Sequence, residues 1–372
     1  MKKIVVIGCG FAGIAAAKKL CSCGDSLEVT VLDPRKYFNF LPLLPVAIGR
    51  GISAEHLLYP IEGLGKKYGF LFINKEAERV DPEKNTVTAD GKAVAYDYLI
   101  LASGTGTNYF GREDLKNSSF KIDDTEDIRK ILEVLENNRF NNYIITGGGY
   151  TGIETASNLW LYLRKRRLSG RIIIVERSSS ILGTLPEWIK EHIGGNLKRC
   201  GVEVKTKTEI KEMQGSKMIL SSGEKLGNSM LLWTVGVQTP GFVRDLPAEK
   251  SSQGRLKVDP FLRIRETVFA AGDSAFFETG KGPLRMAVQF AITEGKTAAD
   301  NIIRSIRGKK LLPYKPLDPG YIIPMADNDS CGIVLGMKAK GRMATMLHYF
   351  MCLYRSCSCK NRIGIIKDLF KS

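Results

Sequence analysis

Residues 143–154 read Y-I-I-T-G-G-G-Y-T-G-I-E. An apolar run, a Gly-x-Gly-x-x-Gly pattern and a helix-like segment follow one another, which predicts a strand, a tight turn and a helix. In such a turn the first glycine permits the bend, the second lets a pyrophosphate approach the backbone, and the third lets helix and strand pack closely. The stretch therefore predicts a dinucleotide-binding unit around Gly147, Gly149 and Gly152.

The same pattern occurs once before, at the N-terminus. Residues 4–13 read I-V-V-I-G-C-G-F-A-G, so that Gly8, Gly10 and Gly13 repeat the spacing. The next apolar run, 27–32, ends in Asp33, where an acidic side chain accepts hydrogen bonds from ribose hydroxyls. Two such units in one chain indicate two nucleotides that face each other.

The second unit has an acid at the equivalent position. The apolar run 171–175 ends in Glu176, and Arg177 follows it. A glutamate there favours a free 2′-hydroxyl, and so NADH over NADPH, because it hydrogen-bonds that group. Arg177 leaves the preference open.

The composition is that of a globular protein with a basic surface. The chain has 372 residues, 44% hydrophobic, with a formal net charge of +16, which is enough for two or three domains. The charge is either a solvated surface or an attraction to an anionic partner. We expect no nucleic-acid binding, because zinc-finger, RNP-like and helix-turn-helix patterns are missing from the sequence.

Membrane-spanning and secreted classes are not expected. No uninterrupted apolar run reaches the roughly 18 residues that a spanning helix needs, so the chain is not expected to pump protons through transmembrane helices. Lys2 and Lys3 before an apolar stretch imitate a signal peptide, but the stretch is too short for one. We therefore expect a protein inside the cell.

The cysteines and histidines predict no metal site. Eight cysteines occur without a C-x-x-C pair, which predicts reduced thiols. His56 and His192 are expected to be structural or exposed, as is His348. A metal cluster of His348 with three nearby cysteines has suitable residue types but matches no zinc spacing; those cysteines are Cys352, Cys357 and Cys359.

The C-terminal region differs in character from the rest. Residues 343–354 read M-A-T-M-L-H-Y-F-M-C-L-Y, and from Lys338 to the end eight Lys or Arg stand against one acid, Asp368. Apolar side chains with basic neighbours are typical of a helix in a membrane interface. The alternatives are a core-packing helix or a homodimer interface.

Local patterns predict the remaining elements. Buried strands run into turns at Gly104, Gly236 and Asp273, and short strands are expected near 321–325 and 332–336. Helices are expected at 53–68, 124–138, 152–168, 187–200 and 286–306.

Four motifs carry a resemblance to a known family. They are Phe40-x-Pro42-Leu43-Leu44 with Gly49 downstream, Tyr96-Asp97-Tyr98-Leu-Ile-Leu-Ala-Ser-Gly104 with Thr107-Asn-Tyr-Phe-Gly111, Gly147-Gly-Gly-Tyr-Thr-Gly-Ile-Glu154, and Val268-Phe-Ala-Ala-Gly-Asp273. With them the chain resembles the flavoproteins that have two dinucleotide-binding domains, and among these the type II NADH:quinone oxidoreductases. The resemblance covers residues 1 to about 310 and is looser beyond.

The resemblance implies an α/β fold with two Rossmann-like domains and a C-terminal membrane-associating region. The FAD domain would comprise residues 1–111 and 241–312, the inserted NADH domain residues 112–240, and the attachment region residues 313–372. Hydride would pass from NADH to FAD, and two electrons would then reduce a membrane quinone without proton pumping. The enzyme would lie on the cytoplasmic face of an anionic membrane.

The resemblance also implies residue roles. Glu154 matches a glutamate near the nicotinamide and the flavin, and Gln289 matches the first glutamine of a quinone-site pattern A-Q-x-A-x-Q. The second glutamine is replaced by Thr293, which leaves the electron acceptor open. FAD would be bound by Gly8, Gly10, Phe11, Ala12, Gly13, Asp33, Val80, Ser103, Gly104 and Asp273. NADH would be bound by Gly147, Gly149, Gly152, Glu176 and Gly236.

Two other functions stay open. A sulfide:quinone oxidoreductase needs a pair of cysteines near the flavin; Cys331 could supply one, but none falls between Cys23 and Cys200. A redox-sensing flavoprotein similar to apoptosis-inducing-factor relatives would hold reduced flavin without fast turnover. Disulfide reductases are not expected, because the loop 40–49 contains no cysteine.

Overall fold

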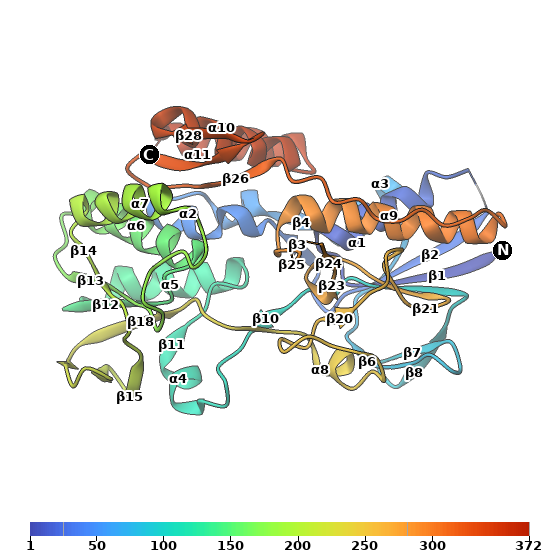
Figure 1. Cartoon of the computed structure of the whole chain (residues 1–372), viewed down its shortest axis with the longest axis horizontal. Helices are drawn as coiled ribbons and strands as arrows, with labels where there is room; N and C mark the ends of the chain where they lie inside the picture. The colour runs from blue at the N-terminus through green and yellow to red at the C-terminus, as the bar shows by residue number, and fades with distance from the viewer. Residues whose placement is uncertain (25, 281, 372) are drawn as a thin grey trace. The chain divides into compact units, whose positions relative to one another are not determined.

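The computed structural model describes residues 1–24, 26–280 and 282–371 (Figure 1). The chain forms two units: residues 1–38, 59–106 and 237–318 make the first, and residues 39–58, 107–236 and 319–372 make the second. The sequence predicts boundaries between the two dinucleotide domains at 111/112 and 240/241. The contacts divide the chain a few residues earlier at both points, and they group the C-terminal residues with the second unit.

The first unit is built on a six-stranded sheet. All neighbouring strands are parallel except β21 and β22. The order is β21 (Arg263–Arg265), β22 (Val268–Ala270), β9 (Tyr98–Leu101), β1 (Lys2–Ile7), β2 (Leu27–Leu32) and β5 (Leu71–Ile73). Its central strands are continuous apolar runs, as a sheet covered on both faces requires.

Helices cover one face of this sheet, and a smaller sheet covers the other. Helix α9 (Val288–Ile306) lies along α1 (Phe11–Cys21) (Figure 1). On the other face Val5 and Ile7 belong to a core shared with Val80 and Val87. The elements that complete the unit are α3 (Ile61–Tyr68), β6 (Ala77–Asp81), β7 (Thr86–Ala89), β8 (Lys92–Ala95), α8 (Gly241–Arg244), β20 (Leu256–Lys257), η3 (Gly272–Ser274), β23 (Ala275–Phe276), β24 (Glu278–Thr279) and β25 (Gly282–Pro283).

The second unit repeats the plan of the first. Its parallel sheet has the order β11 (Ser119–Phe120), β18 (Ser229–Trp233), β12 (Asn142–Thr146), β13 (Arg171–Val175) and β14 (Val202–Lys205). The path β12–α6–β13 corresponds to β1–α1–β2, and β18 to β9. The accompanying elements are α4 (Glu113–Ser118), α5 (Thr125–Asn137), α6 (Tyr150–Lys165), α7 (Glu187–Arg199), β15 (Ile210–Gln214), β16 (Lys217–Leu220) and β17 (Lys225–Leu226). The predicted α/β fold is confirmed.

The aromatic, proline-rich segment 39–58 belongs to the second unit. It forms η1 (Leu41–Leu43), α2 (Leu44–Arg50) and η2 (Ala54–Leu57). The backbone of α2 comes close to α6, since a Cβ at Gly49 would lie 2.5 Å from the carbonyl oxygen of Asn158. The amide and hydroxyl of Thr125 both donate to Asn39 Oδ1 at 2.9 Å. These contacts explain why the segment groups with α5 and α6.

The expected single helix over 53–68 is wrong. The chain forms η2, then β4 (Leu58–Pro60), and only then α3. Pro60 precedes the first residue of α3, and proline cannot continue a helix from the preceding turn because it lacks an N–H donor.

The C-terminal residues form an antiparallel sheet followed by two helices. These are β26 (Gly320–Ile323), β27 (Ser330–Val334), β28 (Met337–Lys340), α10 (Gly341–Arg355) and α11 (Cys359–Lys371). The side chain of Asn361 on α11 donates to the carbonyl oxygens of His56 and Leu58 at 2.9 Å, and Asp368 Oδ2 lies 2.6 Å from His56 Nδ1. Helix α11 is therefore fixed to the segment that contains η2.

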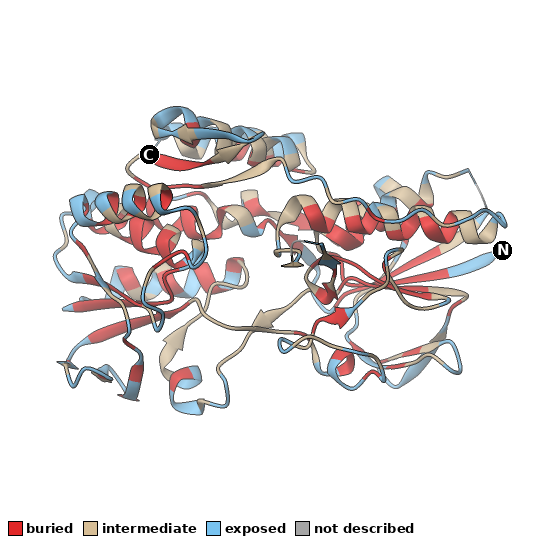
Figure 2. Ribbon diagram, viewed as in Figure 1, coloured by how far each residue is buried: buried red, intermediate tan, exposed pale blue. Residues whose placement is uncertain are grey.

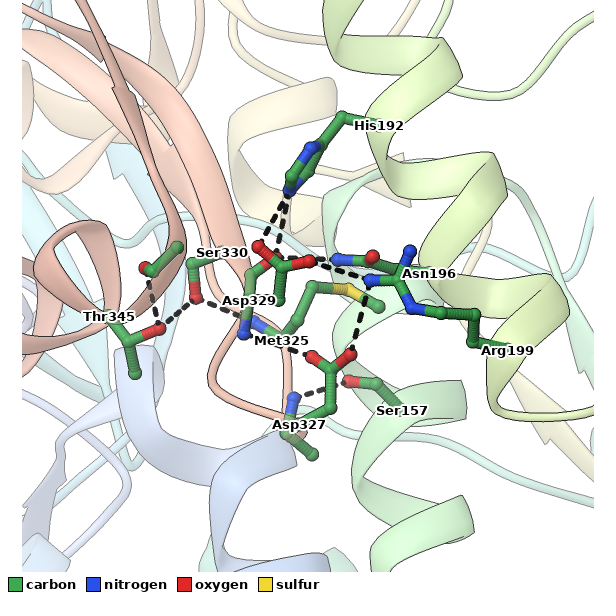
Figure 3. Close-up of polar contacts among 11 residues, drawn as sticks. Ser157, His192, Asn196, Arg199, Met325, Asp327, Asp329, Ser330 and Thr345 are labelled. Carbon is green, nitrogen blue, oxygen red and sulfur yellow. Dashed lines mark hydrogen bonds and ion pairs between the residues drawn. The ribbon is translucent and has the colours of Figure 1, made fainter.

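A polar cluster joins the turn between β26 and β27 to α7 (Figure 3). His192 Nε2 lies 3.1 Å from Asp329 Oδ1, and Arg199 Nη2 lies 2.6 Å from Asp329 Oδ2. Asn196 Nδ2 donates to the carbonyl oxygen of Asp329 at 2.6 Å. His192 and Arg199 thus contact the carboxylate of Asp329, and Asn196 contacts its backbone carbonyl. The three side chains lie on a single face of α7, since their spacing is close to whole helical turns.

The described helices include none that combines the length and the apolarity needed to span a bilayer.

Candidate functional site

The first glycine turn is shaped so that only its middle glycine faces open space. Gly8 has φ +97°, and a Cβ at Gly13 would lie 1.9 Å from the carbonyl oxygen of Gly8. A Cβ at Gly10 would meet no described atom within 4 Å. Packing therefore requires glycine at positions 8 and 13, whereas position 10 leaves room for a ligand to approach the backbone.

The second glycine turn has the same three properties. Gly147 has φ +92°, a Cβ at Gly152 would lie 1.9 Å from the carbonyl oxygen of Gly147, and a Cβ at Gly149 would meet no described atom within 4 Å. In the described residues, the first turns of α1 and α6 contain no acidic side chain, and no side chain caps either helix. Both helix N-termini therefore present N–H groups that favour a phosphate.

Each turn is held by the acid at the end of the next strand. Asp33 Oδ2 accepts the N–H of Cys9 at 2.7 Å, and Glu176 Oε2 accepts the N–H of Gly148 at 2.7 Å. Arg35 also donates to Asp33 at 3.1 Å. Burial raises the pKa of Glu176, but the hydrogen bonds from Gly148 and Ser178 and the charge of Arg177 outweigh it, so the net shift is downward. The two acids thus have equivalent places in the two units.

A second loop lies against the first glycine turn. A Cβ at Gly8 would lie 2.3 Å from the carbonyl oxygen of Ala102 and 2.7 Å from Ser103 Cα. Ser274 Oγ accepts the N–H of Gly104 at 2.8 Å and lies 3.1 Å from Ser103 Oγ. The structure therefore brings together the β1–α1 turn, Ser103–Gly104 and the η3 turn.

Asp273 lies on that η3 turn with an unengaged carboxylate. Among the described residues this carboxylate receives no hydrogen bond and forms no ion pair, whereas the backbone carbonyl oxygen of Asp273 accepts a hydrogen bond from Arg255. Burial raises the pKa of this carboxyl, and the charge of Arg255 opposes the shift. A carboxylate in this position is available to accept hydrogen bonds from hydroxyl groups of a ligand.

The other predicted residues of the first unit are more dispersed. Phe11 begins α1, with its ring 5.0 Å from that of Phe38, and Ala12 Cβ would lie 3.0 Å from a Cβ at Gly272. Val80 is on β6 with its side chain in the core. Gln289 is the second residue of α9.

Gly236 follows β18, as Ser103 and Gly104 follow β9. It has φ +75°, and a Cβ there would lie 2.6 Å from the ring of Phe110. The position therefore requires glycine for packing as well as for its backbone conformation.

Glu154 lies on α6, two residues after Gly152. Burial raises its pKa to about 8, although the side chain keeps part of its surface accessible. Its charge is close enough to α10 to raise the pKa values of Tyr349 and Cys352, for both of which burial is the larger cause. Glu154 therefore carries its proton at neutral pH, beside the C-terminal helices.

The inner face of α10 is polar but not arranged for a metal. Cys352 Sγ lies 3.6 Å from His348 Nε2, and burial lowers the pKa of His348 to about 4. No three His, Cys, Asp or Glu side chains in the described part of the chain are grouped to hold a metal ion. The imidazole is therefore neutral at physiological pH.

Comparison with known families explains the paired turns. The family model for pyridine nucleotide-disulphide oxidoreductases matches residues 2–295. The chain belongs to this family. The match spans both glycine turns, the Ser103–Gly104 loop and Asp273.

Individual relatives are similar over nearly the whole length. Proteins named type II NADH:quinone oxidoreductase from Staphylococcus aureus and Staphylococcus haemolyticus are each 26% identical, with 93% of both chains covered. The solved structure of NDH2 from Plasmodium falciparum in complex with NADH matches with a TM-score of 0.86 at 18% identity, covering 100% of this chain and 98% of that one. The solved structure of the sulfide:quinone oxidoreductase from Aquifex aeolicus matches with a TM-score of 0.76 at 22% identity. The structural matches show the fold.

Three residues at the first site were not predicted from the sequence. They are Arg255 and Glu294, which contact the η3 turn, and Ser274, which belongs to that turn and accepts the N–H of Gly104. For Ser274 the signal was its place directly after Asp273. Glu294 has a subtler signal, because it continues the buried stripe of α9 that contains Phe290, Ala291, Gly295 and Ala298.

Proposed function

We propose that this family member is a type II NADH:quinone oxidoreductase that uses FAD, takes a hydride from NADH and reduces a membrane quinone. The observation that carries the proposal is the pair of matched glycine turns, each with an open middle glycine and an acid that accepts an N–H of the turn. A chain with two such sites is suited to hold two dinucleotides. The relatives that bear this name cover 93% of the chain.

The first unit is the FAD site of this proposal. The open Gly10 and the N-terminus of α1 suit the pyrophosphate, and the unengaged carboxylate of Asp273 suits the ribityl hydroxyls. Asp33 is already hydrogen-bonded to Cys9 and Arg35, so ribose binding there would share or replace the Arg35 contacts. FAD held by these residues would supply the redox chemistry: it can take up a hydride from NADH and pass two electrons, with two protons, to a quinone.

The second unit is the NADH site. Gly149 and the N-terminus of α6 suit the pyrophosphate, and Glu176 suits the adenosine ribose. A carboxylate with a lowered pKa stays ionised and accepts the 2′-hydroxyl, but it repels a 2′-phosphate. NADH is therefore the donor favoured over NADPH.

Glu154 is the proposed acid beside the nicotinamide. Its pKa of about 8 keeps the carboxyl protonated at neutral pH while leaving it close to the range in which it can give up the proton. The alternative role, stabilisation of the helix by an acid near its N-terminus, requires a charged side chain. A neutral carboxyl contributes little to that.

Gln289 is the proposed quinone-side residue, and its neighbourhood on α9 departs from the expected pattern. Thr293 Oγ1 lies 2.8 Å from the hydroxyl of Tyr314 and donates to the carbonyl oxygen of Gln289 at 3.0 Å. A hydroxyl pair therefore stands where the pattern has a second amide.

The C-terminal helices are the proposed membrane contact, at the cytoplasmic face. Of the eighteen large apolar side chains that the structure describes as exposed, nine lie between Leu335 and Phe370. Helix α10 buries Ala344, Thr345 and Cys352 and exposes Met343, Met346, Phe350 and Tyr354 (Figure 2). On α11 exposed Lys367 and Lys371 accompany Ile366 and Phe370. Apolar anchors with basic neighbours suit an anionic membrane surface.

A homodimer interface is the competing use of the same apolar face. Vesicle binding distinguishes the two. Partitioning one phenylalanine is worth about 1.5–3 kcal/mol, so Phe350→Asp should lower binding to anionic vesicles more than tenfold. The matched control is Leu317→Asp, because Leu317 is also exposed but lies in the first unit, outside the two C-terminal helices that are the proposed membrane contact.

The catalytic proposal is tested by steady-state turnover of the purified FAD-loaded protein with NADH and a water-soluble quinone analogue. We expect turnover that depends on both substrates and that NADPH supports poorly. Bound flavin that NADH reduces but no quinone reoxidises would contradict the proposal and would favour a redox-sensing flavoprotein.

A further inference from the structure

The η3 turn that carries Asp273 is held from two sides by buried charged groups. Glu294 Oε2 accepts the N–H of Gly272 at 2.6 Å. Arg255 Nε donates to the carbonyl oxygen of Asp273 at 3.1 Å, and Nη2 donates to that of Ala275 at 2.5 Å. Backbone groups on both sides of Asp273 are therefore fixed by side chains from outside the turn.

Both charged residues are deeply buried, and neither is used in the roles described above. Glu294 is 3% exposed and Arg255 is 6% exposed. No ion pair joins Arg255 to an acid among the described residues. Buried ionisable groups are costly unless hydrogen bonds satisfy them, and the hydrogen bonds that these two side chains make are to the backbone of the η3 turn and of Ala275 after it.

Glu294 itself has a rigid support. It stands on α9 beside Gly295, where a Cβ would lie 2.1 Å from the carbonyl oxygen of Ala12. Helix α9 thus touches α1 directly behind the first glycine turn. The acceptor for Gly272 is therefore set by the same packing that shapes the proposed pyrophosphate site.

We propose that Glu294 and Arg255 are positioning residues for FAD: together they hold the η3 turn so that the Asp273 carboxylate stays free for the flavin's ribityl hydroxyls. The inference rests on the proposed FAD site. It assigns the two residues a role through Asp273 and not through contact with the ring system.

The oxygen acceptor of Glu294, and not its charge, performs this role at neutral pH. The charged and titratable groups that face Glu294 are Asp273, Arg255 and Tyr314. Burial raises the pKa of Glu294 to about 8, so its ionisation at alkaline pH adds a negative charge beside Asp273. We therefore expect wild-type FAD affinity to fall as the pH rises through 8.

The test compares Glu294→Gln and Glu294→Ala with Glu266→Gln, an exposed glutamate of the same unit. FAD is removed from the purified proteins and titrated back, with binding followed by flavin fluorescence at pH 6.5, 7.5 and 9. We expect Glu294→Gln to bind FAD within about twofold of wild type at pH 6.5 and to lose the alkaline decline. Glu294→Ala should bind at least tenfold more weakly, and Glu266→Gln should match wild type at every pH.

Two results would overturn the inference: wild-type affinity in Glu294→Ala, or an alkaline decline that persists in Glu294→Gln. If Glu294→Ala does not fold, the pH comparison of Glu294→Gln with wild type decides alone. Arg255→Met supplies a second arm, with an expected tenfold loss of FAD affinity that leaves NADH binding unchanged. A wild-type protein that does not take up FAD at all would instead refute the proposed function.

Discussion

Replacement of Glu154 by glutamine should stabilise the protein, and only above acidic pH. The pKa of Glu154 rises from 4.5 to about 8 because burial penalises the charged form. The unfolded chain therefore releases this proton near pH 4.5, whereas the folded chain keeps it until about pH 8. Ionisation of Glu154 therefore lowers the stability of wild type as the pH rises through that window, and Glu154→Gln lacks this contribution.

The size of the effect follows from the shift. For a fully buried carboxyl, a pKa shift of this size corresponds to a loss of roughly 5 kcal/mol in the free energy of unfolding. The expected loss for Glu154 is smaller, about 1–3 kcal/mol, because solvent reaches part of its side chain and screens the charge. Glu154→Gln should therefore match wild type below pH 4.5 and exceed its free energy of unfolding by about 1–3 kcal/mol at pH 8.5.

Denaturant unfolding of the FAD-loaded proteins at pH 4.5, 6.5 and 8.5 measures the difference. Glu133→Gln is the matched control, because Glu133 is exposed on α5 and should change stability equally little at each pH. A difference between Glu154→Gln and wild type that is the same at all three pH values would refute the assigned pKa, as would a wild type that is the more stable protein at pH 8.5.

Three further predictions concern the second unit. Gly152→Ala should lower the stability measured by thermal unfolding by about 1–3 kcal/mol or more. The added Cβ would lie 1.9 Å from the carbonyl oxygen of Gly147, and the packed interior has no room for it. A variant as stable as wild type would contradict this close contact. Gly149→Ala should unfold like wild type but bind NADH at least tenfold more weakly, since its Cβ meets only the space assigned to the pyrophosphate; unchanged NADH affinity would remove that assignment. Asn196→Ala should cost about 1–2 kcal/mol and speed amide exchange in residues 320–340, because the part-buried carbonyl oxygen of Asp329 loses its 2.6 Å hydrogen bond and keeps the longer contact with His192 at 3.1 Å. Arg199→Ala removes a more exposed ion pair and should cost at most about 1 kcal/mol. The reverse order would show that the ion pair, and not the hydrogen bond from Asn196, holds the turn.

The repeated parts of the fold were predictable because local patterns determine them. Each glycine turn joins an apolar strand to a helix within about ten residues, and the acid that holds it ends the next strand. The helices found as α5, α6, α7 and α9 carry strong periodicity. The assignments of FAD and NADH to particular residues stay predictions.

Long-range contacts account for what the sequence did not reveal. Helix α2 has Pro45 in its first turn, a position where proline is well tolerated. The proline-rich composition of this segment nevertheless suggested a loop. The role of Asp329 could not be predicted because its partners lie on α7, more than a hundred residues earlier in the chain. Glu294 looked like an ordinary helical acid, although its position in the apolar stripe of α9 would have predicted burial.

Anaerobic reduction of the bound flavin tests the central claim most directly. The FAD-loaded protein is mixed with NADH in one experiment and with sulfide in another, the flavin absorbance is followed, and a water-soluble quinone is then added. We predict rapid bleaching by NADH alone and recovery of the absorbance on addition of the quinone. Bleaching by sulfide but not by NADH would contradict the account.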